Sequence, residues 1–323
     1  MSLSAAKTQY QSPSEPAKSN EAKLLEYFAG LKGATVGQIE SSLFGQKYFF
    51  YEAGFDKHLG YGRGFSRLQG CIKAVAECLE RKFMCEAFQG SLKNTPRWNQ
   101  TSNGFAVHFT ADEAIKSSIR ETIERHILQM TYFRDGWAGF NLLEQTRDGE
   151  FEMQRIVSRY SCSGYRAGIV IVRSEKFSGI AMGYICDLEG EFESSVRWRH
   201  AYFEAIDKIS PMLKTLENGL PLGLQPIDKA LYDWFLNADH KDLKFSNDLS
   251  ILKLPDVFPV VRTFDLSVKW GLDFPFFAAH TSGENILPLV VSERMSKEET
   301  TDVIKLLQRL GLPPKIPSRN PIL

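Results

Sequence analysis

Two segments of the chain share the pattern Glu-x-x-Glu-Arg, which places two carboxylates and a guanidinium close together. The first pair is Glu77 and Glu80, the second is Glu121 and Glu124, and an arginine directly follows each pair. Residues three apart lie on the same face of a helix. Carboxylate oxygens are the ligands that Mg²⁺ prefers, and arginine can hold a phosphate through two hydrogen bonds. The repeated pattern therefore indicates a site for magnesium and phosphate.

A further acid, Glu113, precedes the second pair on the same expected helix. At about 100° per residue, Glu113, Glu121 and Glu124 fall within a sector of about 80°, roughly opposite an isoleucine stripe. Among the five glutamates, only Glu77 and Glu121 have an arginine four residues later, the spacing typical of a solvated helix. Because few basic side chains are spaced to neutralise these glutamates, they favour binding of an external cation. The alternative is an ordinary solvated face, with Glu113 as a capping residue.

Other motifs for nucleotides or metals are missing from the sequence. It contains neither a G-x-x-x-x-G-K-[ST] loop nor a dinucleotide-binding glycine turn. No histidine has a cysteine or carboxylate at metal-binding spacing: we interpret His126 as a core residue and His200 as a surface residue that could also face a cleft. Cys71, Cys78 and Cys85 recur every seven residues, about 10.5 Å apart along a helix, so we expect them in the core.

The elements that must position these residues alternate between strands and helices in the first half of the chain. We expect a helix after Asn20 and a strand at 45–55. Ser66 with Gln69 predicts the N-terminus of the helix that carries the first acidic pair. A short strand at 103–109 then precedes a helix capped by Thr110, which is apolar at Ile115, Ile119, Ile123 and Ile127.

The second half continues the mixed pattern. We expect strands at 165–174, 178–187, 258–267, 273–280 and 286–293. Residues 193–213 indicate a helix interrupted near Pro211, and residues 295–311 a last helix capped by Ser296 and Glu299. The predicted class is mixed α/β (α+β), with a flexible tail at 1–20 and one main domain at 21–323 that ends in a proline-rich tail at 312–323.

Composition gives little indication of a charged partner. Lys plus Arg and Asp plus Glu each number 39, so no nucleic-acid or membrane partner is expected. No apolar run is long enough to span a membrane and no signal peptide precedes the chain, which predicts a cytoplasmic protein. A local exception is a strip of arginines that could bind nucleic acid or an acidic peptide: Arg155, Arg159, Arg166 and Arg173. The default interpretation is that these arginines only keep the surface soluble.

Several of these motifs together resemble the YcaO proteins. The sequence G-R-G at 62–64 is followed by the first Glu-x-x-Glu-Arg, then by S-N-G-x-A at 102–106, an E-A pair and the second Glu-x-x-Glu-Arg, with prolines after L-G-L-P-P. The resemblance covers most of residues 60–126 and the last dozen. It implies a YcaO fold and ATP-dependent activation of a peptide backbone amide, giving an azoline, a thioamide or an amidine.

The resemblance also implies roles for individual residues. Magnesium ligands would be Glu77, Glu80, Glu113, Glu121 and Glu124. Nucleotide contacts would come from Arg63, Ser102, Asn103, Phe109, Arg125 and Glu204. Catalysis would involve Arg125, Pro317, Pro321 and Leu323.

The chain departs from the family pattern at several of these positions. Many members have G-N-T where this chain has residues 108–110, so Phe109 replaces an asparagine; G-K-G is here G-R-G, at Arg63. The E-x-x-Q of many members has Glu204 and Asp207 as its nearest counterpart. The terminus also lacks the P-x-P-x-P of azoline-forming members. The nucleotide-contact set therefore matches the family less well than the metal-ligand set.

Two functions remain open from the sequence. The first is a stand-alone YcaO-type cyclodehydratase or amide-activating enzyme that uses ATP and Mg²⁺ on a peptide or protein substrate. A second protein would deliver this substrate, because the YcaO-like part leaves no room for a fused peptide-recognition domain. The alternative is a catalytically inactive YcaO scaffold that binds a peptide or a partner enzyme. A homodimer is a further partner hypothesis.

Overall fold

The computed structural model describes residues 18–39, 49–96, 100, 102–148, 151–174, 177–206, 243–248, 250–287 and 295–316. Its labelled helices are α1 (Asn20–Gly30), α2 (Arg67–Gln89), α3 (Ala111–Asp135), the 3₁₀ helix η2 (Gly136–Gly139), α6 (Leu266–Trp270) and α7 (Lys297–Arg309). Residues 197–206 form a further helix. The strands are β1 (Thr35–Ile39), β2 (Phe49–Phe55), β3 (His58–Gly64), β4 (Phe105–His108), β5 (Phe140–Asp148), β6 (Phe151–Cys162), β7 (Tyr165–Ser174), β8 (Phe177–Leu188), β9 (Leu252–Lys253), β10 (Val260–Asp265) and β11 (Phe277–Ser282).

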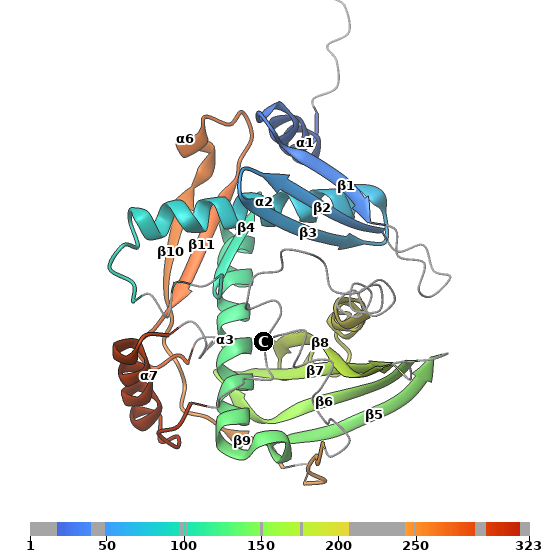
Figure 1. Cartoon of the computed structure of the whole chain (residues 1–323), viewed down its shortest axis with the longest axis vertical. Helices are drawn as coiled ribbons and strands as arrows, with labels where there is room; N and C mark the ends of the chain where they lie inside the picture. Colours follow the sequence, from blue (N-terminus) through green and yellow to red (C-terminus); the bar gives the residue numbers. More distant parts are fainter. Residues whose placement is uncertain are drawn as a thin grey trace, which may run out of the picture.

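Three sheets are arranged around two long helices (Figure 1). Strands β1, β2 and β3 form an antiparallel sheet beside α2, and β10, β11 and β4 form a second one. The largest sheet has the order β5-β6-β7-β8, with β9 paired to β6. Helix α3 runs from the two smaller sheets down to this large sheet (Figure 1). It therefore carries side chains into the region between the upper and lower halves of the molecule.

Glycines let β3 lie directly on the backbone of α2. A Cβ on Gly60 would come within 2.2 Å of the Ala74 carbonyl oxygen, and one on Gly62 within 1.9 Å of the Gly70 oxygen. Only residues without side chains allow so close an approach. This contact fixes β3, and with it Tyr61 and Arg63, relative to the acidic pair on α2.

Helix α3 is held on the large sheet by its apolar side. Ile123 and Ile127 are buried in one core with Ile169 and Ile171 of β7. Burying each such side chain contributes about 1.5–3 kcal/mol. The opposite face of the sheet is covered by residues 197–206, where Trp198 packs into a separate cluster. The large sheet is thus covered on both faces, and each covering helix supplies residues to the site described below.

The expected helix starts are confirmed, although two capping boxes form only in part. Ser66 accepts a hydrogen bond from the Gln69 N–H, but the Gln69 side chain accepts from Phe65 instead of Ser66. Thr110 accepts from the Glu113 N–H. The box at the start of α7, between Ser296 and Glu299, is complete.

The mixed α+β class is also confirmed, but the sequence did not predict every strand. Strands β1, β3, β5, β6 and β9 were missed. Strand β1 is only five residues long, β3 contains three glycines, and β6 is interrupted by a register shift that obscures its alternation. Of the expected strand at 286–293, only 286–287 are described, and the interruption near Pro211 lies outside the described residues.

Within the described residues, no helix combines the length and apolar character needed to cross a membrane.

All five cysteines are free thiols, and the three that repeat every seven residues are buried or partly buried, as expected for packing residues.

A buried histidine makes stability depend on pH. His280 is 4% exposed, its ring lies 4.4 Å from that of Phe105, and burial, assisted by Arg262, lowers its pKa to about 4. Because its pKa in the unfolded chain is near 6.5, the folded state binds the proton less tightly, so stability falls as pH drops from 6.5 towards 4. We expect a loss of about 2 kcal/mol from this group between pH 7.5 and pH 5.

Urea unfolding at several pH values measures this loss. His280→Leu should reduce the pH dependence and leave the part due to His126, whose pKa burial also lowers to about 4, whereas His108→Leu, at an exposed position, should leave it unchanged. Equal slopes in the wild type and His280→Leu would contradict the assignment.

Candidate functional site

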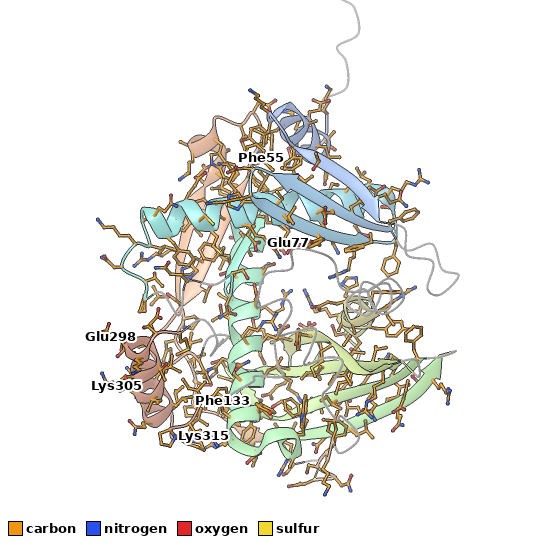
Figure 2. The ribbon with its side chains drawn as sticks, in the orientation of Figure 1. Phe55, Glu77, Phe133, Glu298, Lys305 and Lys315 are labelled. Atoms are coloured by element: carbon orange, nitrogen blue, oxygen red, sulfur yellow. The ribbon has the colours of Figure 1, made fainter. Side chains whose placement is uncertain are left out.

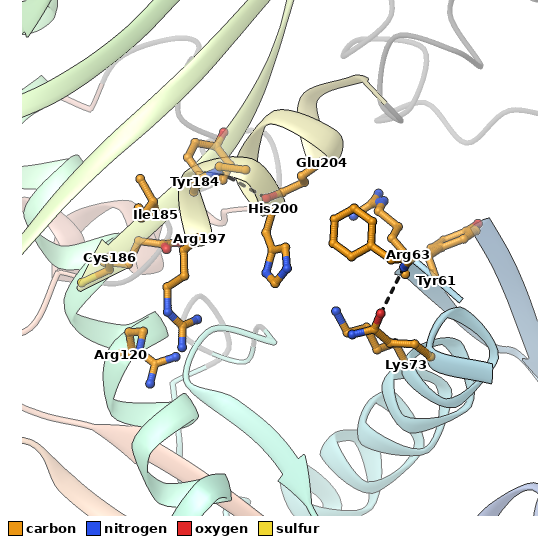
Figure 3. Close-up of a pocket in the computed structure, with 15 residues that line it drawn as sticks. Tyr61, Arg63, Lys73, Arg120, Tyr184, Ile185, Cys186, Arg197, His200 and Glu204 are labelled. Carbon is orange, nitrogen blue, oxygen red and sulfur yellow. Dashed lines mark hydrogen bonds between the residues drawn. The ribbon is translucent and has the colours of Figure 1, made fainter. Parts of the chain in front are cut away.

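A cavity of about 210 Å³ opens between the upper and lower halves of the molecule (Figure 3). One wall comes from β3 and α2, another from α3, and the third from β8 and residues 197–206. The charged lining residues are Arg63, Lys73, Arg120, Glu124, Arg197 and Glu204. Three of these, Arg63, Glu124 and Glu204, are residues that the YcaO resemblance places at a site.

The acids of α2 and α3 come together beside this cavity. Glu77 lies on the side of α2 that faces the large sheet (Figure 2), where its carboxylate accepts from the Tyr61 N–H at 2.7 Å and from Arg81 at 2.6 Å. Glu80 interacts electrostatically with Glu121 as well as with Glu77. Two segments more than 40 residues apart in sequence thus present their carboxylates to one another, as the repeated pattern predicts.

The pKa values of two of these acids are raised because the acids are buried close to one another. Burial, followed by repulsion from Glu121 and Glu77, raises the pKa of Glu80 well above its usual range. Burial also raises the pKa of Glu121 to about 8, with Arg125 opposing and Glu124 and Glu204 adding to the shift. Carboxyl groups with raised pKa values favour a bound cation or proton, because either relieves the repulsion.

Arg125 is fixed between the acids and the large sheet. Its Nε lies 3.7 Å from Glu124, and its guanidinium stacks 4.5 Å above the ring of Tyr184 on β8. Burial alone would lower its pKa, but Glu124 and Glu121 raise it, so the side chain keeps its charge. Its Nη1 is buried and has no hydrogen-bond partner in the described part of the chain. This donor is therefore available to an anion.

Basic residues come from all three walls of the cavity. Arg63 and Lys73 come from β3 and α2, Arg120 from α3 and Arg197 from the helix at 197–206, and they face a common space in Figure 3. Burial and then repulsion from Arg63 and Arg197 lower the pKa of Lys73. Burial followed by Arg120 likewise lowers the pKa of Arg197, against the opposing effect of Asp187. Cations that repel one another in this way favour a multivalent anion.

Glu204 connects this site to the large sheet. Its carboxylate accepts a hydrogen bond from the Tyr184 N–H at 3.2 Å, drawn as a dashed line in Figure 3. Gly183 allows the approach, because a Cβ there would lie 1.8 Å from the Ala201 carbonyl oxygen. The helix at 197–206 is therefore positioned by backbone contact, as β3 is on α2.

Three further predicted residues, like Glu77, Glu80, Glu121 and Arg125, are not among the cavity-lining residues. Glu113 sits in the first turn of α3 with its carboxylate 3.2 Å from Lys116 and its side chain 47% exposed, about 12 Å along the helix from Glu121. Ser102 is exposed, and Asn103 is buried in the turn before β4. The role of Glu113 as a metal ligand and those of Ser102 and Asn103 as nucleotide contacts remain predictions.

Phe109 packs with other aromatic residues. Its ring centroid is 5.9 Å from that of Phe276 and 6.4 Å from that of Phe274, and it is not among the cavity-lining residues. This geometry favours a packing role over contact with a nucleotide. The catalytic candidates Pro317, Pro321 and Leu323 lie outside the described residues.

The candidate arginine strip on the large sheet is largely neutralised. Three of its four members have a carboxylate within 3.4 Å: Arg155 with Glu144, Arg159 with Asp248 and Arg166 with Glu193. Such pairs are typical of a solvated sheet surface, the default interpretation.

Sequence reasoning missed Lys73, Arg120 and Arg197. A signal for the first two was present, since Lys73 precedes Glu77, and Arg120 precedes Glu124, by four residues, which places each base on the face of its acid. The predicted ion pairs included only arginines that follow the acids in sequence. Arg197 lies far away in sequence and reaches the cavity only through the packing of its helix on β8.

The structure resembles several solved proteins. A heterocyclase in complex with substrate and cofactor aligns with 83% of this chain at 11% identity and a TM-score of 0.54. A chain of the E. coli microcin synthetase McbBCD complex aligns with 78% of this chain and 88% of its own length, at 11% identity and a TM-score of 0.52. YcaO from Methanopyrus kandleri bound with AMPPCP and Mg²⁺ aligns with 86% of this chain and 93% of its own, at 15% identity and a TM-score of 0.49.

The chain spans about half of the heterocyclase, 52% of its length. Neither protein-family models nor the sequences of curated proteins match this chain. At such low identities the structural likeness concerns the fold, and it confirms the YcaO-like fold that the resemblance implies.

Proposed function

We propose that this chain is a YcaO-type enzyme that binds Mg²⁺ and ATP in the cavity between α2, α3 and the large sheet, and uses ATP to activate a peptide backbone amide. The observation that carries the proposal is that acids and bases meet around one space. Glu80, Glu121 and Glu124 lie close together where α2 meets α3, Glu124 lines the cavity, and Arg63, Lys73 and Arg120 line it as well. A magnesium polyphosphate has the complementary distribution, with a hard cation beside an extended anion.

The donor set suits magnesium. Glu80, Glu121 and Glu124 offer carboxylate oxygens, and burial followed by repulsion between the acids raises the pKa values of the first two, a cost that a bound divalent cation would offset. Within the described residues, no three acidic, cysteine or histidine side chains are close enough to hold a metal ion as they stand. A cation bound here would therefore have to draw its carboxylates together.

The chain's own residues account for the positioning of the reactants. Arg125 is oriented by the Tyr184 ring and offers a buried donor to a phosphate, while Lys73 and Arg120 add two further cations. In the proposed reaction a nucleophile loses its proton and adds to the amide carbon, and the amide oxygen then takes the terminal phosphoryl group of ATP with release of ADP. The C–O bond then breaks, phosphate leaves, and the amide nitrogen loses its proton to form a C=N bond. Magnesium would supply charge stabilisation for the phosphoryl transfer.

Thermal unfolding with nucleotide tests the proposal. Millimolar ATP with Mg²⁺ should raise the melting temperature, and Arg120→Ala should weaken ATP binding at least about tenfold, because a charge-assisted hydrogen bond contributes about 1.5–3 kcal/mol. Lys305→Ala, at an exposed site on α7 (Figure 2), is the matched control and should bind normally. If Mg²⁺ and ATP leave the melting temperature unchanged, the nucleotide site is refuted.

The same measurement separates the enzyme from the inactive scaffold. The scaffold hypothesis rested on Phe109 and on the irregular C-terminal tail. Phe109 packs against Phe276 and is not among the cavity-lining residues, and the tail beyond residue 316 lies outside the described residues. We therefore favour the enzyme. Delivery of the peptide by a second protein stays part of the proposal, and reconstitution with such a partner should raise the rate of phosphate release.

A further inference from the structure

The entrance to the cavity has an unusual composition. We define the mouth as Phe65, Arg67 and Leu68, where β3 leads into α2, together with Val196, Arg199 and His200 on and just before the helix at 197–206. Three of these side chains are large, apolar and exposed: Phe65 at 42%, Leu68 at 56% and Val196 at 77%. Exposed apolar side chains on the segments that border a site are typical of a surface that receives a partner.

The two sides of the mouth meet at Phe65. Its ring centroid lies 5.6 Å from that of Phe203 and 6.3 Å from that of His200, and the Arg199 guanidinium stacks 4.4 Å above it. His200 also lines the cavity, opposite Arg63 and Lys73 in Figure 3. The mouth is therefore continuous with the proposed reaction site.

The charged groups of the mouth are all basic. Arg67 and Arg199 are exposed, and within the described part of the chain neither forms an ion pair. Each guanidinium stacks on a phenyl ring instead, that of Phe49 for Arg67 and that of Phe65 for Arg199. A stacked guanidinium is held in place, yet its edge remains free to donate to a carboxylate.

We propose that the mouth is the docking surface for an extended peptide in which apolar residues are flanked by aspartate or glutamate. The inference rests on the proposed function, since an amide that reacts in the cavity must arrive over this rim. Apolar side chains of the peptide would cover Phe65, Leu68 and Val196, and its carboxylates would pair with Arg67 and Arg199. Nucleic acid fits less well, because two of the three exposed apolar residues are aliphatic and give a base no ring to stack on.

Fluorescence anisotropy tests the docking surface without any nucleotide. The probes are a fluorescein-labelled heptapeptide, Asp-Glu-Phe-Gly-Phe-Glu-Asp, and its counterpart with lysine at every acidic position. We expect the full chain to bind the acidic peptide about tenfold more tightly than the basic one at low ionic strength. Arg199→Glu and Phe65→Ala should each weaken this binding about fivefold or more. Arg309→Glu, the same charge change on α7 across the molecule, should not.

The outcomes separate this inference from the proposed function. Equal affinity for the two peptides, or equal loss in Arg199→Glu and Arg309→Glu, overturns the docking surface. Preferential binding of a labelled ten-nucleotide single strand that Arg199→Glu abolishes overturns it in favour of nucleic acid. If the acidic peptide binds as expected but Mg²⁺ and ATP leave the melting temperature unchanged, the proposed function fails while the docking surface stands.

Discussion

In metal-free buffer at pH 8.5, Glu121→Gln should be more stable than the wild type and yet almost inactive. Glu121 has a folded pKa of about 8 against 4.5 in the unfolded chain, because it is buried beside Glu124 and Glu204. The folded state therefore binds this proton more tightly, and the stability it contributes at low pH is lost as pH rises from 4.5 through 8. The neutral amide avoids that loss, on the order of 3 kcal/mol after allowance for partial exposure.

The gain in stability should depend on pH and be accompanied by a loss of function. It should shrink below pH 5, where the wild-type carboxyl is already protonated, and phosphate release with Mg²⁺ and ATP should fall about 100-fold or more. Glu298→Gln, at an exposed position on α7, is the control and should change neither quantity. A lower melting temperature with unchanged phosphate release would make Glu121 a structural residue only.

The long helices could be predicted because their signals are local. Ser66 and Thr110 cap α2 and α3 as the sequence indicates, and the isoleucine stripe of α3 identifies the side that packs on the sheet. Strands β5 and β6 gave no such signal. A register shift interrupts each of their pairings, and β6 is buried in part on both faces, which removes the alternation that marks a strand.

The acidic side of the candidate site had the clearest sequence signal. A repeated pattern on two helices revealed Glu77, Glu80, Glu121 and Glu124 as a group. Helix periodicity alone also included Glu113, although the rise of the helix separates it from Glu121 by about 12 Å. The angle of a residue around the helix axis therefore predicts which face of the helix it lies on. Its position along the axis decides which residues of that face can bind the same ligand.

Part of the basic side depends on contacts that no local pattern records. Arg197 and Tyr184 reach the cavity from the large sheet and its covering helix, whose position is fixed where Gly183 meets the Ala201 backbone. Glu204 was identified through the family resemblance, and its hydrogen bond to the Tyr184 N–H then follows from that packing. A site built from α2, α3 and the large sheet with its covering helix can be identified only when the packing of these elements is known.

The glycines that place those layers lead to the last expected result: Gly62→Ala should destabilise the protein by about 3 kcal/mol and weaken ATP binding. Its new Cβ would lie 1.9 Å from the Gly70 carbonyl oxygen and 2.1 Å from the Ala74 nitrogen, both backbone atoms of α2 that no rotamer change can move. Strand β3 must then separate from α2, breaking the hydrogen bond from the Tyr61 N–H to Glu77 and displacing Arg63 from the cavity wall. Urea unfolding monitored by tryptophan fluorescence measures the stability, with Gly37→Ala as control because a Cβ on that strand residue meets no atom within 4 Å. If the two variants unfold at the same urea concentration, contact between β3 and α2 does not position the site.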